Sequence, residues 1–232
     1  MKISSCNSAE VVATAGAHLV FDLATEAISE RGQFTMALSG GSTPWVMLRK
    51  LAERDLPWES VNIFQVDERV APDGDPERNL GHILDNFTKR ISLPPENLHA
   101  MPVTDDDLDE ASRQYEQSLI GLAGESPVLD LVHLGIGGDG HTASLVPDDP
   151  VLDIADRDVA ATDTYAGLRR MTLTYPIINR ARHILWLITG QGKAEILNRL
   201  LQADTGIPAG RVSQLQATVV ADAAALSRHL QN

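Results

Sequence analysis

Cysteine is almost absent from this chain, because Cys6 is the only one among its 232 residues. A single cysteine cannot form a disulfide within the chain, which fits a protein that works in a reducing compartment. Cys6 also lies near the N-terminus in a polar stretch, where a catalytic thiol is not expected. Residues 1–5 lack the apolar core that a signal peptide needs. We therefore expect a cytoplasmic protein.

Basic and aromatic residues are also scarce. The 19 Lys and Arg residues are outnumbered by 32 Asp and Glu residues, so the formal net charge is −13, and aromatic residues make up only 4%. A charge of this sign repels nucleic-acid phosphates and anionic membrane surfaces, and few rings are available to stack on bases. No apolar run is expected to reach the ~20 residues of a membrane span. The composition argues against nucleic-acid and membrane partners, and it allows a small anionic ligand where basic residues gather locally.

Several catalytic motifs are missing. The sequence contains no Gly-Lys-Ser/Thr ending of a Walker loop, no Gly-x-Ser-x-Gly elbow and no His-Glu-x-x-His. No spacing of His and Cys residues indicates a zinc site. We therefore expect no metal site and no serine hydrolase of the usual kind.

What the chain does contain is a regular alternation of short apolar runs with segments of helical periodicity. This alternation predicts an α/β fold, with a Rossmann-like, mostly parallel sheet flanked by helices on both faces. No repeat or linker divides the chain, so we expect one domain over 1–232. The predicted strands are 34–38, 61–66, 128–134, 171–174, 184–188 and 218–220, and the predicted helices after the first are 45–54, 80–87, 108–122, 193–201 and 222–230.

The first helix is predicted from both of its ends. Residues 7–10 (Asn-Ser-Ala-Glu) resemble a capping box, with an N-cap side chain and Glu10 at the third helical position. Gly32 ends the helix. The apolar residues that recur at helical spacing are Val11, Ala15, Leu19, Leu23 and Ile28.

Three polar segments each follow a predicted strand, and ligands bind at the carboxyl edge of a parallel sheet. The first segment is Ser39-Gly40-Gly41-Ser42-Thr43-Pro44. Its two glycines let the backbone approach a ligand closely, and Ser42 or Thr43 can cap a helix that has Pro44 in its first turn. Free N–H groups at a helix start bind phosphate. Phosphate binding and a plain strand-to-helix turn both fit this segment taken alone.

The second segment is Asp67-Glu68-Arg69, directly after an apolar strand. Three charged residues are costly to bury unless they are paired or used. Taken alone, the segment is more simply interpreted as a solvated loop. On the ligand edge, however, Asp67 and Arg69 become candidates for polarising or holding a substrate.

The third segment is Gly135-Ile136-Gly137-Gly138-Asp139-Gly140-His141-Thr142-Ala143-Ser144. It matches Gly-x-Gly-x-x-Gly, the pattern of a dinucleotide site, but two features argue against such a site. The pattern normally opens a long helix, whereas here Pro147 and Pro150 stop any helix. It also normally lies in the first βαβ unit, whereas here it comes late in the chain. Asp139 and His141 fit another role, since an imidazole beside a carboxylate makes a general base near pH 7. A histidine that only stabilises a tight turn is the alternative.

Cations gather late in the chain. Arg169 and Arg170 precede the predicted strand 171–174, and Lys193 lies in Gly190-Gln191-Gly192-Lys193-Ala194 after another strand. Cations at this edge would complement a phosphate. Ordinary surface charge explains any one of the three equally well.

Together these residues resemble 6-phosphogluconolactonases over essentially the whole chain. The signature segments are 38–44, 66–69 and 134–145, and 169–174 and 190–194 follow in the family's order and spacing. The resemblance implies a fold similar to glucosamine-6-phosphate deaminase and ribose-5-phosphate isomerase. It also implies hydrolysis of 6-phospho-D-glucono-1,5-lactone to 6-phosphogluconate in the oxidative pentose phosphate pathway, without a metal or organic cofactor.

By resemblance, His141 is the general base and Asp139 orients it. The Gly40–Thr43 loop, with Gly41 and Ser42, would hold the phosphate together with Arg169 and Lys193, and the choice between Arg169 and its neighbour Arg170 stays open. Arg69 would contact the substrate near its reacting end, and Asp67 either takes part in the chemistry or braces the loop. The departures from the family pattern are Val146, where an aromatic residue is common, and Arg78-Asn79, where Ser-Asn is frequent.

Two other functions remain open from the sequence. An amino-sugar-phosphate deaminase or isomerase has a related fold but carries a further carboxylate just after the histidine turn, where this chain has none until Asp148. A sugar-phosphate sensor would need an output module, and no helix-turn-helix segment or basic extension is seen. As partners we expect only the small sugar-phosphate lactone, with the protein a monomer or a weak homodimer.

Overall fold

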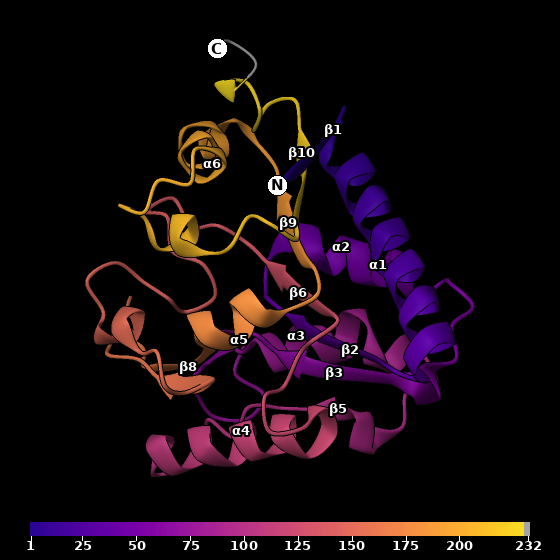
Figure 1. The fold of residues 1–232 in the computed structure, drawn as a ribbon, viewed down its shortest axis with the longest axis vertical. Coiled ribbons are helices and arrows are strands. Elements are labelled where there is room, and N and C mark those ends of the chain that lie inside the picture. The colour runs from indigo at the N-terminus through magenta and orange to yellow at the C-terminus, as the bar shows by residue number, and fades with distance from the viewer. Residues whose placement is uncertain (230–232) are drawn as a thin grey trace.

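The computed structural model describes residues 1–229. Within them the chain forms a seven-stranded sheet in the order β1-β10-β9-β6-β2-β3-β5 and a three-stranded sheet in the order β4-β8-β7 (Figure 1). Neighbouring strands of the main sheet are all parallel, whereas the small sheet is antiparallel. The predicted fold, a mostly parallel sheet flanked by helices, is confirmed.

The elements have the following bounds. The main sheet contains β1 (Lys2–Cys6), β2 (Phe34–Leu38), β3 (Val61–Gln65), β5 (Leu98–His99), β6 (Leu131–Leu134), β9 (Ile184–Ile188) and β10 (Ala217–Asp222). The small sheet contains β4 (Asp67–Arg69), β7 (Val159–Ala161) and β8 (Arg170–Leu173). The helices are α1 (Ala9–Arg31), α2 (Ser42–Leu51), α3 (Asn79–Asn86), α4 (Leu108–Ala123), α5 (Tyr175–Arg180) and α6 (Ala194–Leu201).

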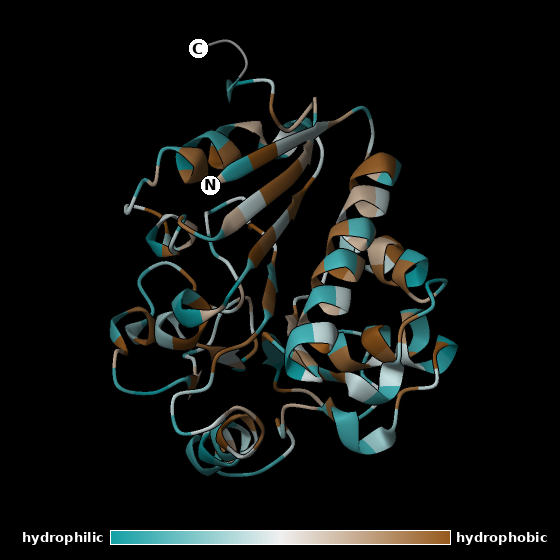
Figure 2. Cartoon of the chain, turned by 45° about the vertical axis from the view of Figure 1, so that its right-hand side comes forward, coloured by the Kyte–Doolittle hydropathy of each residue, from teal (hydrophilic) through white to brown (hydrophobic). Residues whose placement is uncertain are grey.

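The central strands of the main sheet, β10, β9, β6, β2 and β3, are buried on both faces. In β9, Ile184, Trp186 and Ile188 belong to one apolar core, and Leu185 and Leu187 belong to the other. The first core includes buried residues of α4, α5 and α6, and the second includes those of α1, α2 and α3. Burial on both faces is the reason these strands are continuous apolar runs in the sequence, and Figure 2 shows hydrophobic strands between helices that carry hydrophilic residues.

The start of α1 differs slightly from the prediction. The N-cap is Ser8, whose hydroxyl accepts from the amide of Val11. Glu10 is therefore the second helical residue, and the predicted capping box with Glu10 at the third position is wrong. Gly32 ends the helix as predicted, with a left-handed φ of 78°.

The same helix overturns the expectation that no apolar run reaches membrane length. Among the described residues, α1 is one helix that is long and apolar enough to cross a membrane by length and composition. In the fold it packs on α2 and on strands β9 and β10, which bury one of its faces. The buried residues on that face are Val12, Ala13, Gly16, Ala17, Val20, Ala24 and Ala27. Helix α1 is thus a core helix of this fold.

Other predicted elements needed correction. The predicted helix 222–230 is absent from the described residues, because β10 continues to Asp222 and turns follow to residue 228; the predicted end at Leu230 lies outside the described residues. The predicted strand 171–174 exists as β8 but belongs to the small sheet. Helix α2 begins at Ser42 instead of residue 45. Elements β1, β4, β5, β7 and α5 were not predicted.

The order of the strands positions the site. Strands β9, β6, β2 and β3 are consecutive neighbours in the sheet and all run in the same direction. The loops that follow them therefore leave the sheet side by side at its carboxyl edge. The segments that follow these strands are the three polar segments, of which 67–69 forms strand β4, and the Gly190–Lys193 segment.

Candidate active site

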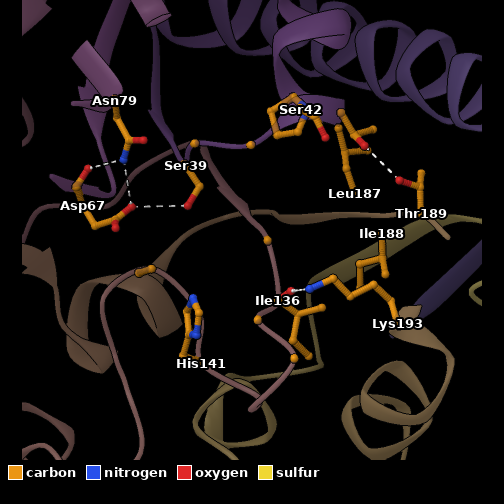
Figure 3. A pocket seen from close by; sticks show the side chains of 18 of the residues that line it. Ser39, Ser42, Asp67, Asn79, Ile136, His141, Leu187, Ile188, Thr189 and Lys193 are labelled. Atoms are coloured by element: carbon orange, nitrogen blue, oxygen red, sulfur yellow. Dashed lines mark hydrogen bonds between the residues drawn. The ribbon is translucent and has the colours of Figure 1, made fainter. Parts of the chain in front are cut away.

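A cavity of about 480 Å³ opens at this edge. The three polar segments predicted to share one edge all contribute to its lining, and so does Lys193. The predicted site residues that line it are Gly40, Gly41, Ser42, Thr43, Asp67, Arg69, His141, Arg170 and Lys193. Figure 3 shows Asp67, Ser39 and Asn79 grouped on one side of the cavity above His141, with Thr189 and Lys193 on the other side.

His141 and Asp139 form a close pair. The Nδ1 atom of the imidazole lies 2.6 Å from Oδ1 of Asp139, and the backbone N–H of His141 donates to the same oxygen over 3.2 Å. A carboxylate only accepts, so Nδ1 carries the proton and Nε2 is the ring nitrogen left for a ligand. The hydroxyl of Tyr165 donates to the other oxygen, Oδ2, over 2.8 Å.

These contacts keep Asp139 ionised. Partial burial by itself would raise the pKa of this carboxyl, but the hydrogen bonds from Tyr165 and His141 outweigh that effect and hold the pKa below its ordinary value. The pair therefore presents a carboxylate that orients an imidazole whose second nitrogen has no hydrogen-bond partner among the described residues. A histidine held in this way is able to accept a proton from a ligand or a water molecule.

Glycines make the histidine turn. The amide of Gly137 donates to the carbonyl of His141 over 2.8 Å, and the amide of Gly140 donates to the carbonyl of Gly137 over 3.1 Å. A Cβ atom at Gly137 would lie 2.1 Å from Nδ1 of His141 and 2.6 Å from Oδ1 of Asp139. Gly140 has a φ of 87°, which other residues rarely adopt. The turn thus requires both glycines so that His141 can fold back on Asp139.

The Gly40–Thr43 loop leads into helix α2 at the cavity. The N-cap is Gly41, with a φ of 138°, and no side chain caps the first amides of the helix. An uncapped helix start carries partial positive charge and free N–H groups, so it can bind an anion. The hydroxyl of Thr43 lies 2.9 Å from that of Thr189, which joins this loop to the end of β9. Nearby, the ammonium of Lys193 donates to the carbonyl of Ile136 over 2.7 Å.

Asp67 lies buried on the opposite side of the cavity and is only 4% exposed. Its Oδ2 accepts from the hydroxyl of Ser144 over 2.7 Å, and its Oδ1 lies 3.5 Å from Ser39 Oγ and from Asn79 Nδ2. The carboxylate therefore links the loop after β2, the start of α3 and the segment that follows His141.

Two arginines stand beside this carboxylate. Arg69 and Arg170 are directly opposite each other in the β4–β8 pair. Burial and the nearby charge of Arg69 both lower the pKa of the Arg170 guanidinium. Within the described chain, the Nε atoms of both arginines are buried without a hydrogen-bond partner. Arg170 is buried and Arg69 is half-buried, and both have a donor that is not used. Asp67 is the only acidic residue of the described lining. This excess of positive charge favours an anionic or strongly polar ligand.

Arg169 is not brought into the cavity. Its side chain is exposed, and its Nε donates to the carbonyl of Thr162 over 3.2 Å. Neighbouring residues of a strand point to opposite faces, so only one of the two arginines can face the cavity, and the structure places Arg170 there. Arg170 lies with its guanidinium 5.1 Å from the ring centre of Tyr165, which bonds Asp139.

The solvated-loop interpretation of 67–69 is wrong for Glu68 as well as for Asp67. Glu68 is fully buried and accepts, each over 2.8 Å, from the backbone amides of Arg69, Asn79 and Leu80 and from the side chain of Gln65. Arg78, noted as a departure from the family pattern, lies 3.7 Å from it. Glu68 thus binds the start of α3 to strand β4.

Sequence reasoning missed several residues of the site. Asn79 accepts from Nη1 of Arg69 over 2.5 Å, and its amide fills the space that a Cβ atom of Gly40 would occupy at 2.1 Å. Ser144 and Tyr165 contact Asp67 and Asp139 respectively. Asn79 and Ser144 were within quoted segments, but no signal in the sequence reveals their partners. Among the described residues no group of three or more His, Cys, Asp or Glu side chains could hold a metal ion.

Comparison with known proteins gives consistent matches. The model of the family described as glucosamine-6-phosphate isomerases/6-phosphogluconolactonase matches residues 7–221. A 6-phosphogluconolactonase of Synechocystis sp. is 39% identical over 180 residues, which cover 76% of this chain and 75% of that protein. The crystal structure of a 6-phosphogluconolactonase from Thermotoga maritima is 28% identical with a TM-score of 0.85, covering 95% of this chain and 98% of the other.

A monomeric glucosamine-6-phosphate deaminase also shares the fold, with a TM-score of 0.82 and 24% identity over 98% of this chain and 100% of the other. That likeness shows the fold alone. The family model spans most of the sequence, and relatives of one name cover about three quarters of it. The chain therefore belongs to the glucosamine-6-phosphate isomerase/6-phosphogluconolactonase family and is an enzyme of its 6-phosphogluconolactonase branch.

Proposed function

We propose that this chain hydrolyses 6-phospho-D-glucono-1,5-lactone to 6-phosphogluconate, the ring-opening step of the oxidative pentose phosphate pathway. The observation that carries the proposal is the His141–Asp139 pair, with Nδ1 and Oδ1 2.6 Å apart, at a cavity that also holds cationic groups. The names of the relatives support the substrate class.

His141 acts as the general base. Its Nε2 removes a proton from a water molecule as the water attacks the lactone carbonyl, and Asp139 stabilises the imidazolium that forms. The protonated Nε2 then gives its proton to the ring oxygen as the C1–O5 bond breaks. The products are the carboxylate of 6-phosphogluconate, the freed hydroxyl and one proton released to solvent. Proton transfer of this kind contributes roughly 10²–10⁴-fold.

One side of the cavity binds the phosphate, and the other side stabilises the reacting end of the substrate. The uncapped start of α2 and Lys193 receive the phosphate, away from Asp67, whose charge would repel it. Arg69 and Arg170 lie near the His141 side and stabilise the oxyanion of the tetrahedral intermediate. Asp67 accepts from Ser144 and lies close to Ser39 and Asn79, so we assign it a bracing role.

The test is lactone consumption above the spontaneous rate. The lactone is generated fresh from glucose 6-phosphate, and acid release is followed with and without the protein. We expect catalysis in the parent and a loss of roughly 10²–10⁴-fold in His141→Ala. His18→Ala removes an exposed histidine of α1 and is the matched control, with the parent's rate. A turnover of His141→Ala within a few-fold of the parent would show that the base is another group.

An inactive but folded protein would contradict lactone hydrolysis itself. The next assay would then be ammonia release from glucosamine 6-phosphate, because the deaminase shares the fold. That reaction is disfavoured here, since the described lining contains Asp67 as its only carboxylate and Asp148 does not reach it.

A further inference from the structure

Tyr165 lies at the tip of the hairpin that joins β7 to β8. The backbone groups of Tyr165 and Leu168 exchange hydrogen bonds of 3.0 and 3.2 Å across a two-residue turn. The turn residues Ala166 and Gly167 have φ values of 52° and 87°, the left-handed pair of a type I′ hairpin. This tight turn fixes where the tyrosine ring leaves the backbone.

Three contacts place that ring behind the His141–Asp139 pair. The Tyr165 hydroxyl donates to Oδ2 of Asp139 over 2.8 Å. The ring meets the imidazole of His141 edge to face, with centres 5.5 Å apart and planes at 65°. The guanidinium of Arg170 lies over the Tyr165 ring, 5.1 Å from its centre. Tyr165 does not itself line the cavity, so it can act only through these neighbours.

The Tyr165 hydroxyl bonds the same carboxylate that holds the imidazole. Oδ1 of the carboxylate bonds His141, and a bond at Oδ2 stops the carboxylate from rotating about its axis. The same bond draws negative charge toward Oδ2 and away from the imidazole. The titratable groups that face Asp139 are His141 and Tyr165, and Arg170 faces Tyr165 in turn. Within the described residues no other charged group acts on Asp139 or Tyr165, while Arg69, Asp67 and Glu77 act on Arg170.

We propose that Tyr165 is a positioning residue for lactone opening: its hydroxyl and ring fix the Asp139 carboxylate and the His141 imidazole in the orientation that general-base attack requires. This inference rests on the proposed function. It assigns a role to a hairpin that none of the three signature segments includes, and it makes the small sheet a support for the base.

The test compares Tyr165→Phe, which loses the hydroxyl, with Tyr165→Leu, which loses the ring contact as well. We expect Tyr165→Phe to lower kcat about tenfold with KM unchanged, the effect of one charge-assisted hydrogen bond. Tyr165→Leu should lose about 10²-fold, because the imidazole is no longer held. In Tyr165→Phe the acid limb of the kcat/KM profile should move to higher pH, since Asp139 then stabilises a protonated imidazole more strongly.

The matched control is Tyr175→Phe, which removes a hydroxyl that bonds the carbonyl of Pro208 outside the cavity lining. It should keep the parent's pH profile whatever it does to stability. The proposal is overturned if Tyr165→Phe keeps both kcat and the acid limb of the parent. It is equally overturned if kcat falls without any movement of the acid limb, which would indicate a structural role alone.

A second readout separates this proposal from the proposed function. The proton between Nδ1 and Oδ1 should give a downfield proton NMR signal in the parent that disappears in Asp139→Asn. The signal should shift or broaden in Tyr165→Phe and stay unchanged in Tyr175→Phe. These results would show that Tyr165 fixes the Asp139–His141 contact whether or not the lactone is the substrate, and an unchanged signal in Tyr165→Phe would contradict that part of the proposal.

Discussion

Because Gly137 has no side chain, His141 can lie against Asp139 in the candidate site. The space that its Cβ atom would fill is taken by the contact between His141 and Asp139. Gly40 has the same relation to the amide of Asn79. The sequence suggested that the glycines of the 39–44 segment let the backbone approach a ligand, but at Gly40, as at Gly137, the structure shows that the glycine makes room for other side chains of the site.

Gly137→Ala should therefore lower kcat about 10²-fold, because the new methyl group pushes the imidazole away from Asp139 while both residues remain present. Circular dichroism should show the parent's fold. Gly192→Ala is the matched control: its added methyl meets nothing within 4 Å, and Gly192 is outside the cavity lining. Equal rates in the two variants would mean that the turn adjusts freely and that the close contact is not required.

A substitution at Lys193 tests whether this side of the cavity binds the phosphate of the substrate. Replacing Lys193 by Met keeps an unbranched side chain one atom shorter and removes the charge, so Lys193→Met should raise KM for the phosphorylated lactone by about 10-fold or more. Hydrolysis of unphosphorylated glucono-1,5-lactone should change little, because that substrate has no phosphate to bind. A similar loss with both lactones would place Lys193 at the reacting end instead.

The motif residues of the site could be predicted from the sequence because each follows a strand that is clear from its apolar run. Tyr165 and Ser144 could not be assigned roles, because their partners are distant in sequence and depend on how the small sheet folds against the main one. The choice between Arg169 and Arg170 also needed the structure, since it depends on which face of strand β8 is turned toward the cavity.

At the scale of elements, helix α3 is held by a residue outside it. Glu68 accepts from the amides of Asn79 and Leu80, which are the first two residues of the helix. The side chain of this β4 residue therefore caps the start of α3. The helix start in turn places Asn79 against Arg69 and Asp67.

Glu68→Gln should lower the free energy of unfolding by about 2–3 kcal/mol, because an amide NH₂ would then face backbone N–H donors in a fully buried site. Urea unfolding measures the loss. Glu77→Gln changes an exposed glutamate just before the same helix and should cost little. Equal midpoints for the two variants would show that water or rearrangement replaces the buried contacts.

Strand β1 and helix α1 show where sequence patterns fail for elements. Strand β1 is mostly exposed and polar, and it is held by pairing with β10, which no local pattern reveals. In α1 the large residues are only partly buried, while small residues face the sheet. A Cβ atom on Gly16 would lie 2.9 Å from Leu187, so the helix sits too close for larger side chains on that face.

At the scale of the whole molecule, His133 ties stability to pH. It lies fully buried in β6, and within the described chain neither ring nitrogen has a hydrogen-bond partner. Burial lowers the pKa of this imidazole to about 4, from an ordinary value of 6.5. Between these two values the unfolded chain binds a proton at His133 and the folded chain does not. The contribution of neutral His133 to the free energy of unfolding is therefore fully present above pH 6.5, and it is lost as the pH falls toward 4.

The expected loss is about 3 kcal/mol over that window. Burial lowers the pKa of His99 and His183 as well, which adds in the same direction. Urea unfolding at pH 7 and pH 5 tests this: His133→Leu should lose less stability than the parent between the two values. If both proteins lose the same amount, another group is responsible for the acid sensitivity.

Strands β1 and β10 are neighbours in the sheet although they are the first and last strands of the described chain. During synthesis, α1 leaves the ribosome long before the β9 and β10 strands that its buried face will cover. At ~5–20 residues per second this wait is on the order of 10–40 seconds. Helix α2 can cover part of α1 early, but the side of α1 that faces β9 and β10 stays uncovered through most of the chain's production. The yield in a cell should therefore depend on chaperones that bind such apolar surfaces early.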